Sequence, residues 1–258
     1  MKAIILAAGF GTRLEKGLRE YSGPHSQALQ EGVENKPKGL VPIRGKPVVG
    51  YHVEQFQRIG IPPQRIYVHT NAVYVDAFRE WARYAGIPLE NIFSNGVTRH
   101  QDRKEQVGDM LLAFQHVGYD DPVILFANDT LVYGRDGNIH NLTTMVGGYN
   151  SDHLSRVAVY FKGTGAEQNG VVTFDENFEV TSFREKPAGV QSGHINASVY
   201  LFSPKKLQEM RDRTSELIGY KNPLEVIWPG FKVELVSHRL DIGTIEDVLA
   251  ANGWVGEQ

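Results

Sequence analysis

The chain contains no cysteine and no long hydrophobic run among its 258 residues. Without cysteine, a disulfide framework, a thiolate metal site and a cysteine nucleophile are all excluded. The longest apolar run, Pro122 to Ala127, is far shorter than the roughly 20 residues that cross a bilayer. Met1 and Lys2 lead directly into an apolar strand rather than a cleavable leader, so we expect a soluble, cytoplasmic protein with no membrane contact.

A large excess of either charge is also missing. The 27 basic and 30 acidic residues give a formal net charge of -3, which argues against a broad nucleic-acid or membrane surface but leaves a local phosphate site open. With 41% hydrophobic and 22% charged residues, the composition is that of an ordinary globular protein. The length predicts one domain, residues 1–258, built from two sub-lobes.

Strands and helices alternate in the first half of the sequence. Apolar strands are predicted at Lys2 to Ala8, Arg65 to His69 and Val123 to Ala127, and helices at residues 46–59, 73–84 and 105–117. This alternation predicts a mostly parallel sheet with right-handed crossovers. Between the first predicted strand and the helix at 46–59, the segment Glu15 to Asn35 is polar and contains glycine. We expect a long loop there, of the kind that is functional or mobile.

The second half has a different pattern. After about residue 155, strands follow one another with few helices between them: Val157 to Phe161, Gly170 to Phe174, Val180 to Arg184 and Ser198 to Phe202. A helix at Pro204 to Arg213 follows, and a last helix begins near Thr244, where Thr244 and Asp247 can form a capping box. The whole predicts an α/β three-layer sandwich with a mixed central sheet and a smaller mixed β lobe.

The first strand ends in a glycine-rich turn, Leu6 to Leu14 (LAAGFGTRL). Gly9 and Gly11 allow backbone N–H groups to approach phosphate oxygens. Leu14 stands where a dinucleotide-binding turn has a third glycine, and no Gly-Lys-Ser/Thr follows, so that turn and a P-loop are both excluded. Arg13 supplies a permanent cation with bidentate geometry instead. A plain tight turn with a surface arginine remains the alternative.

Further charged residues follow strands or prolines. Pro37 stiffens the backbone before Lys38. Asp129 follows an apolar strand, and ligands of open α/β sheets bind at the carboxyl ends of strands, where a carboxylate suits Mg²⁺. Asp241 precedes the last helix without being needed for its cap, which makes it a candidate second metal ligand. Each of these residues has an ordinary alternative as a solvated turn residue.

Two short strings in the second half could recognise a sugar phosphate. In FREKP, Glu185 is of a type that hydrogen-bonds sugar hydroxyls, and Lys186 could hold a phosphate. In NASVY, Asn196 is a second candidate for sugar hydroxyls. Surface charges near a turn are the alternative explanation for all three residues.

The order of these strings is more specific than any one of them. LAAGFGTRL, KPKGLVPIRGKPVV, Asp129, FREKP, NASVY and DIGT together resemble the sugar-1-phosphate nucleotidyltransferases (nucleoside-diphosphate-sugar pyrophosphorylases) over about residues 1–250. The resemblance implies a Rossmann-like fold with a nucleotide-binding half at about 1–130, a sugar-phosphate-binding half at about 131–240 and a C-terminal helix at 241–258. It also implies an NTP and a sugar 1-phosphate as ligands, Mg²⁺ as cofactor and no nucleic acid. Homo-oligomers are common in this family, and the oligomeric state is left open.

The resemblance implies a role for each residue of this chain that matches a position of the family motifs. The nucleotide pocket would comprise Leu6, Ala7, Ala8, Gly9, Gly11, Thr12, Arg13, Lys38 and Gly108. Sugar-phosphate contacts would come from Gly170, Glu185, Lys186 and Asn196. Asp129 and Asp241 would hold Mg²⁺, and Arg13, Lys38 and Asp129 would be catalytic. The implied reaction is an in-line attack by the sugar-1-phosphate oxygen on the α phosphorus of an NTP, which needs no protein nucleophile because the phosphate is already anionic.

The sequence departs from the family pattern in four places. The segment between Arg13 and Lys38 is longer than usual, Asn128 and Ser198 replace glycines, and the entry to the helix around Gly108 matches the base-side pattern only loosely. The nucleobase and the sugar are therefore not assigned. Two alternatives remain: transfer to another phosphate or phosphonate, and a non-catalytic nucleotide-sugar sensor.

Overall fold

The computed structural model describes residues 1–134, 138–139, 142–218, 220, 222 and 224–254. Its main sheet has nine strands, in the order β10-β9-β11-β6-β1-β4-β5, with β8 pairing with both β11 and β12. Four strands are parallel neighbours: β5 (Ile92–Ser94), β4 (Ile66–Thr70), β1 (Lys2–Ala7) and β6 (Val123–Ala127). This part corresponds to the parallel sheet that the alternating pattern predicts.

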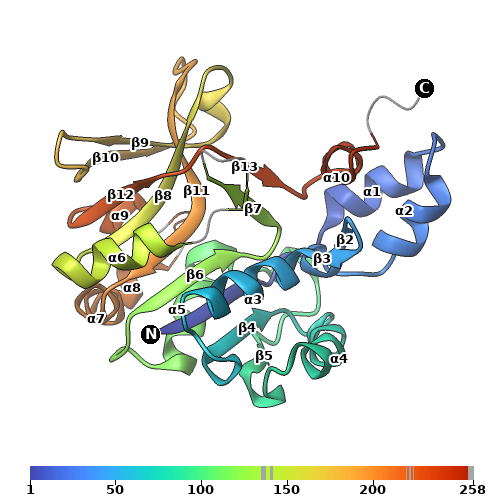
Figure 1. Cartoon of the computed structure of the whole chain (residues 1–258), viewed down its shortest axis with the longest axis horizontal. Helices are drawn as coiled ribbons and strands as arrows, with labels where there is room; N and C mark the ends of the chain where they lie inside the picture. The colour runs from blue at the N-terminus through green and yellow to red at the C-terminus, as the bar shows by residue number, and fades with distance from the viewer. Residues whose placement is uncertain (135–137, 140–141, 219, 221, 223, 255–258) are drawn as a thin grey trace.

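The second half continues the same sheet with mostly antiparallel pairs. Strand β11 (Gly193–Phe202) runs antiparallel to β6, β8 and β9, so it joins the two halves of the molecule. The remaining strands of this lobe are β8 (Ser155–Lys162), β9 (Gly170–Phe174), β10 (Val180–Glu185) and β12 (Phe231–Leu235). Because β12 runs parallel to β8, the lobe is mixed, as expected. Figure 1 shows β9 and β10 at the outer end of this lobe.

Helices cover both faces of the sheet, because β1 alternates its side chains between two cores. Ile5 packs in a core with residues of α3 and α4, whereas Ile4 packs in a second core with residues of α5 and α7. The helices of these layers are α3 (Val48–Arg58), α4 (Val75–Ala85), α5 (Glu105–Val117), α6 (Thr143–Asp152), α7 (Pro204–Asp212), α8 (Thr214–Leu217) and α9 (Leu224–Ile227). The result is the predicted three-layer α/β sandwich with a Rossmann-like core.

The segment 15–35 corrects one prediction. It does not form a long loop but most of two helices, α1 (Thr12–Glu20) and α2 (Ser26–Val33). Leu14 and Leu18 on α1 and Leu29 and Val33 on α2 lie four residues apart, so each pair faces one side of its helix. All four are buried in a third core shared with α10 (Ile245–Asn252). In Figure 1 these three helices form a group at the end opposite the β9–β10 hairpin.

Short strands complete the fold and carry part of the site. β7 (Thr130–Tyr133) pairs antiparallel with β13 (His238–Asp241), and β2 (Pro42–Ile43) pairs with β3 (Lys46–Pro47). The predicted capping box is present at the start of α10, between Thr244 and Asp247. Within the described residues, no helix is both long and apolar enough to cross a membrane. Residues 255–258 of the predicted C-terminal segment lie outside the described residues.

Candidate functional site

The glycine-rich turn connects β1 to the N-terminus of α1. Gly11 is the N-cap residue of α1 and has a φ of 67°, a left-handed conformation that favours glycine. The first turn of this helix has the partial positive charge that suits an anion. Arg13 lies in that turn, lines the adjacent cleft and forms no ion pair with any described residue. The turn thus places a guanidinium in the first turn of a helix, beside its N-terminus.

Lys38 and Asp129 come together from segments far apart in the sequence. Lys38 begins a short 3-10 helix, Lys38–Leu40, and its Nζ lies 2.8 Å from Oδ2 of Asp129 in the turn after β6. Gly39 makes this approach possible, because a Cβ there would lie 2.7 Å from Val49 Cγ1 and 3.1 Å from Asn128 Cβ. Asn128, one of the departures from the family pattern, therefore packs against the backbone that carries Lys38.

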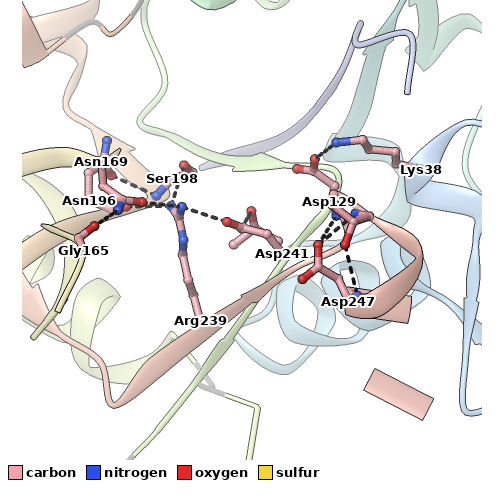
Figure 2. A network of polar contacts seen from close by, with 12 residues as sticks. Lys38, Asp129, Gly165, Asn169, Asn196, Ser198, Arg239, Asp241 and Asp247 are labelled. Carbon is pink, nitrogen blue, oxygen red and sulfur yellow. Dashed lines mark hydrogen bonds and ion pairs between the residues drawn. The ribbon is translucent and has the colours of Figure 1, made fainter. Parts of the chain in front are cut away.

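Asp241 is the last residue of β13, opposite Thr130 of β7. Its Oδ1 accepts a hydrogen bond from Thr130 Oγ1 at 2.8 Å, and its Oδ2 lies 2.7 Å from Arg239 Nη2 (Figure 2). Burial raises the pKa of Asp241, the guanidinium of Arg239 opposes the rise, and the negative charge of Asp129 adds to it. The two carboxylates are therefore close enough to affect each other electrostatically.

The capping box fixes the chain just beyond Asp241. Asp247 Oδ2 accepts hydrogen bonds from the backbone N–H groups of Gly243 (3.0 Å) and Thr244 (2.8 Å) (Figure 2). A Cβ on Gly243 would lie 3.7 Å from Nη2 of Arg13. The start of α10 is thus held next to the start of α1, and both border the cleft.

The four residues predicted to contact the sugar phosphate differ in their position relative to the cleft. Gly170 and Glu185 are cross-strand partners of β9 and β10, and a Cβ on Gly170 would lie 2.5 Å from Phe183 Cζ. Lys186 lines the cleft and forms no ion pair with the described residues. Asn196 is buried within β11, which begins at Gly193 rather than at Ser198 as predicted.

Asn196 holds a bulge in β11. Its Oδ1 accepts from the backbone N–H of Ser198 at 2.8 Å, and its Nδ2 donates to the hydroxyl of Tyr200. The pairing of β11 with β8 shifts register here, and Ser198 has a φ of 58°. Ser198, not Asn196, lines the cleft. A sugar contact by the Asn196 side chain stays a prediction.

One cleft of about 540 Å³ collects most of the predicted residues at the carboxyl ends of β1 and β6. Those lining it are Leu6, Ala8, Gly9, Arg13, Lys38, Asp129, Lys186 and Asp241. The others do not line it: Ala7, Gly11, Thr12, Gly108, Gly170, Glu185 and Asn196. Ala7, for example, is fully buried in the core that contains α3 and α4.

Sequence reasoning missed four charged residues of this cleft: Arg103 and Glu105, which pair with each other, Asp109 and Arg239. Arg239 belongs to none of the motifs, and only the pairing of β13 with β7 brings it to the site. Asp109 lies one turn into α5, and its Oδ1 accepts from Asn95 Nδ2 at 2.7 Å and pairs with His69 Nε2 at 3.1 Å. No local sequence signal marks Asp109 or Arg239, because most of the residues that hold their side chains belong to other segments of the chain.

The donor set fits a magnesium ion. Asp129 and Asp241 offer carboxylate oxygens on one cleft, and oxygen is the ligand type that Mg²⁺ prefers. Among the described residues, there is no group of three or more histidine, aspartate or glutamate side chains that could hold a metal. Two carboxylates suit Mg²⁺, which keeps several waters and binds substrate phosphates.

At the carboxyl edge of the parallel sheet, the cleft combines a glycine turn, several cations and two carboxylates, an arrangement that suits phosphorylated ligands. The family model of the nucleotidyl transferases matches residues 33–256. The chain therefore belongs to the nucleotidyl transferase family.

Similar proteins agree with this membership. A UTP–glucose-1-phosphate uridylyltransferase of Synechocystis is 24% identical over 96% of this chain, which spans 61% of that relative's length. A glucose-1-phosphate thymidylyltransferase of Mycolicibacterium smegmatis is 26% identical, with 99% of this chain and 82% of the relative covered. The crystal structure of a Bacillus anthracis protein named as a putative glucose-1-phosphate thymidylyltransferase shares the fold, with a TM-score of 0.72 and 19% identity. The match covers 100% of this chain and 96% of that chain.

Proposed function

We propose that this chain transfers a nucleoside monophosphate from an NTP to a sugar 1-phosphate, giving an NDP-sugar and pyrophosphate. The observation that carries the proposal is the cleft itself, where Arg13, Lys38 and Lys186 lie with Asp129 and Asp241. Such a mixture of cations and carboxylates suits two phosphorylated substrates and a metal ion. The names of the two relatives, which specify glucose 1-phosphate, support the sugar acceptor.

The cations have separate roles in this proposal. Arg13 and the N-terminus of α1 bind the β and γ phosphates, and Lys38 neutralises charge near the α phosphorus. Lys186, which follows β10 on the other side of the cleft, binds the phosphate of the sugar. One oxygen of that phosphate forms a bond to the α phosphorus, and the bond from the α phosphorus to the bridging oxygen of pyrophosphate breaks. Positioning and charge neutralisation supply the catalysis.

Asp129 and Asp241 hold Mg²⁺ in this proposal, and the bound ion supplies further positive charge to the phosphates. Other residues of the chain position these two carboxylates and compensate their charge. Thr130 fixes one oxygen of Asp241, and Lys38 compensates the charge of Asp129 until phosphates attract the ammonium. Self-association of the chain and a cytoplasmic location also stay predictions.

The first experiment measures pyrophosphate release with Mg²⁺ over a grid of NTPs and sugar 1-phosphates, with phosphocholine and a phosphonate as further acceptors. We expect one strong NTP–sugar pair. Asp129→Asn should fold normally and lose Mg²⁺-dependent turnover, by about 3–4 kcal/mol of barrier on the scale of one lost oxyanion-hole donor. Asp212→Asn is the matched control, because Asp212 is also ion-paired but is exposed at the end of α7 and does not line the cleft.

Two outcomes would contradict the proposal. Turnover with a non-sugar acceptor alone would move the chain to another branch of nucleotidyl transfer. A blank grid with intact NTP binding would favour the sensor alternative. Wild-type turnover by Asp129→Asn would remove that residue from the metal site.

A further inference from the structure

The two carboxylates assigned to the metal each pair with a cation of the same cleft. Lys38 Nζ lies 2.8 Å from Asp129 Oδ2, and Arg239 Nη2 lies 2.7 Å from Asp241 Oδ2. These cations are only 14% and 15% exposed at their side chains, yet both line the cleft. A metal ion and a neighbouring ammonium or guanidinium compete for the same carboxylate oxygens.

Contacts from several segments fix the position of the Arg239 guanidinium. Its Nη1 donates to the backbone oxygen of Asn196 at 2.7 Å and, more weakly, to Ser198 Oγ at 3.4 Å (Figure 2). Its Cζ lies 5.9 Å from the ring centroid of Tyr160. The guanidinium is thus held beside the β11 bulge, at the border between the metal carboxylates and the β lobe.

Arg239 also lies close to the segment that carries the proposed sugar-phosphate lysine. Its Nη2 contacts Asn169 Oδ1 at 3.4 Å, and the backbone oxygen of the same Asn169 accepts from the backbone N–H of Lys186 at 3.0 Å. Asn169 therefore connects the guanidinium of Arg239 to the backbone of Lys186. A guanidinium has five N–H donors in a planar fork that matches a phosphate, so it can bind two phosphate oxygens at once.

We propose that Arg239 is an anion-binding residue of this cleft: it neutralises Asp241 before the metal binds and then binds the sugar phosphate together with Lys186. The exchange follows from charge. Asp241 would exchange the guanidinium for a metal ion, and the guanidinium would exchange Asp241 for an incoming phosphate. This inference rests on the proposed function, because it uses the same two ligands.

Binding measurements test the exchange without turnover. Arg239→Met removes the competing positive charge and the planar guanidinium donors while keeping a long side chain. Mn²⁺ alone, followed by electron paramagnetic resonance, should bind this variant roughly 3- to 10-fold more tightly than the wild type. Inorganic phosphate, titrated in the presence of Mn²⁺, should bind at least about 10-fold more weakly.

Three comparison variants separate the effects. Lys186→Met should weaken phosphate binding and leave the Mn²⁺ affinity within about 2-fold, since Lys186 contacts neither carboxylate. Arg211→Met, which removes an exposed, ion-paired arginine of α7, should change neither affinity. Arg239→Lys keeps the positive charge but loses the planar guanidinium that can bind two phosphate oxygens at once. Phosphate should therefore bind about 3- to 10-fold more weakly, and the Mn²⁺ affinity should not change.

Weaker Mn²⁺ binding by Arg239→Met would overturn the proposal, because it would mean that Arg239 only holds Asp241 in place. Unchanged phosphate affinity in Arg239→Met or Arg239→Lys would also overturn it. If the methionine variant does not fold, as judged by circular dichroism and thermal unfolding, the lysine variant decides. A blank pyrophosphate-release grid leaves both affinities measurable, so failure of the proposed function is recognised separately.

Discussion

His52 links the stability of the fold to pH directly beneath the site. Its side chain is fully buried in α3, and its Nε2 lies 2.8 Å from the backbone oxygen of Thr130. Since a carbonyl oxygen can only accept, Nε2 carries the proton and the neutral ring donates. Burial lowers the pKa of His52 from 6.5 to about 4, against the opposing effects of this hydrogen bond and of Asp129.

The sign and size of the effect follow from these two pKa values. Between pH 6.5 and about 4, the unfolded chain binds a proton at His52 and the folded chain does not. The free energy of unfolding therefore falls as the pH falls through this window, and the contribution is fully present only above pH 6.5. A difference of about 2.5 pKa units corresponds to roughly 3 kcal/mol lost by pH 4.

Urea unfolding of the wild type and His52→Gln at several pH values between 7 and 4 measures this loss. Acidic residues titrate in both proteins, so the informative quantity is the difference between their curves. We expect the wild type to lose roughly 3 kcal/mol more than the variant over this range. His100→Gln, at an exposed histidine, should follow the wild type. Parallel curves for the wild type and His52→Gln would refute the reasoning.

Three substitutions test how the chain positions the site. Gly39→Ala puts a methyl group 2.7 Å from Val49, so we expect the free energy of unfolding in urea to fall by about 1–3 kcal/mol and turnover to fall as well. The control is Gly147→Ala on α6, where the added methyl group has open space and should not destabilise the fold. Equal stability of the two variants would contradict the close approach at Gly39. Lys186→Ala should raise KM for the sugar phosphate without changing NTP affinity, and equal loss of both would assign the lysine elsewhere. Thr244→Ala should cost about 1 kcal/mol of unfolding free energy through the lost capping box, and unchanged stability would exclude that role.

The sequence predicted best those elements whose apolar residues form a clear local pattern. β6, β9 and α5 have the predicted bounds, because apolar runs and apolar 3.6-residue spacing are strong local signals. The rule that ligands bind at the carboxyl ends of parallel strands predicted the place of Asp129. These parts of the fold need no knowledge of distant contacts.

The parts that were missed depend on contacts between distant segments. α1 and α2 bury only one face each, in a core that they share with α10, more than 200 residues later in the chain. Their sequence is therefore mostly polar and was interpreted as a loop. Arg239 reaches the cleft through the pairing of β13 with β7 and the bulge at Ser198. Asp109 depends on His69 and Asn95 from other segments. Single-sequence patterns do not encode such pairings.

The ion pairs of the cleft lead to one further expectation, which concerns the coupling between ligands. A metal ion alone must displace Lys38 from Asp129 or Arg239 from Asp241, and a phosphate alone must draw the same cations away from their carboxylates. A metal ion and phosphates together exchange both kinds of partner at once, so neither charge is left unpaired in the cleft. We therefore expect positive coupling: Mn²⁺ should bind at least about 10-fold more tightly in the presence of a bound NTP, and by reciprocity the NTP more tightly with Mn²⁺.

Titrations of each ligand with and without the other measure the coupling, after correction for the Mn²⁺–NTP complex formed in solution. In Lys38→Met the protein-dependent part should shrink, because one displaced cation is gone. Undiminished coupling in that variant would show that the ion pairs do not link the two ligands.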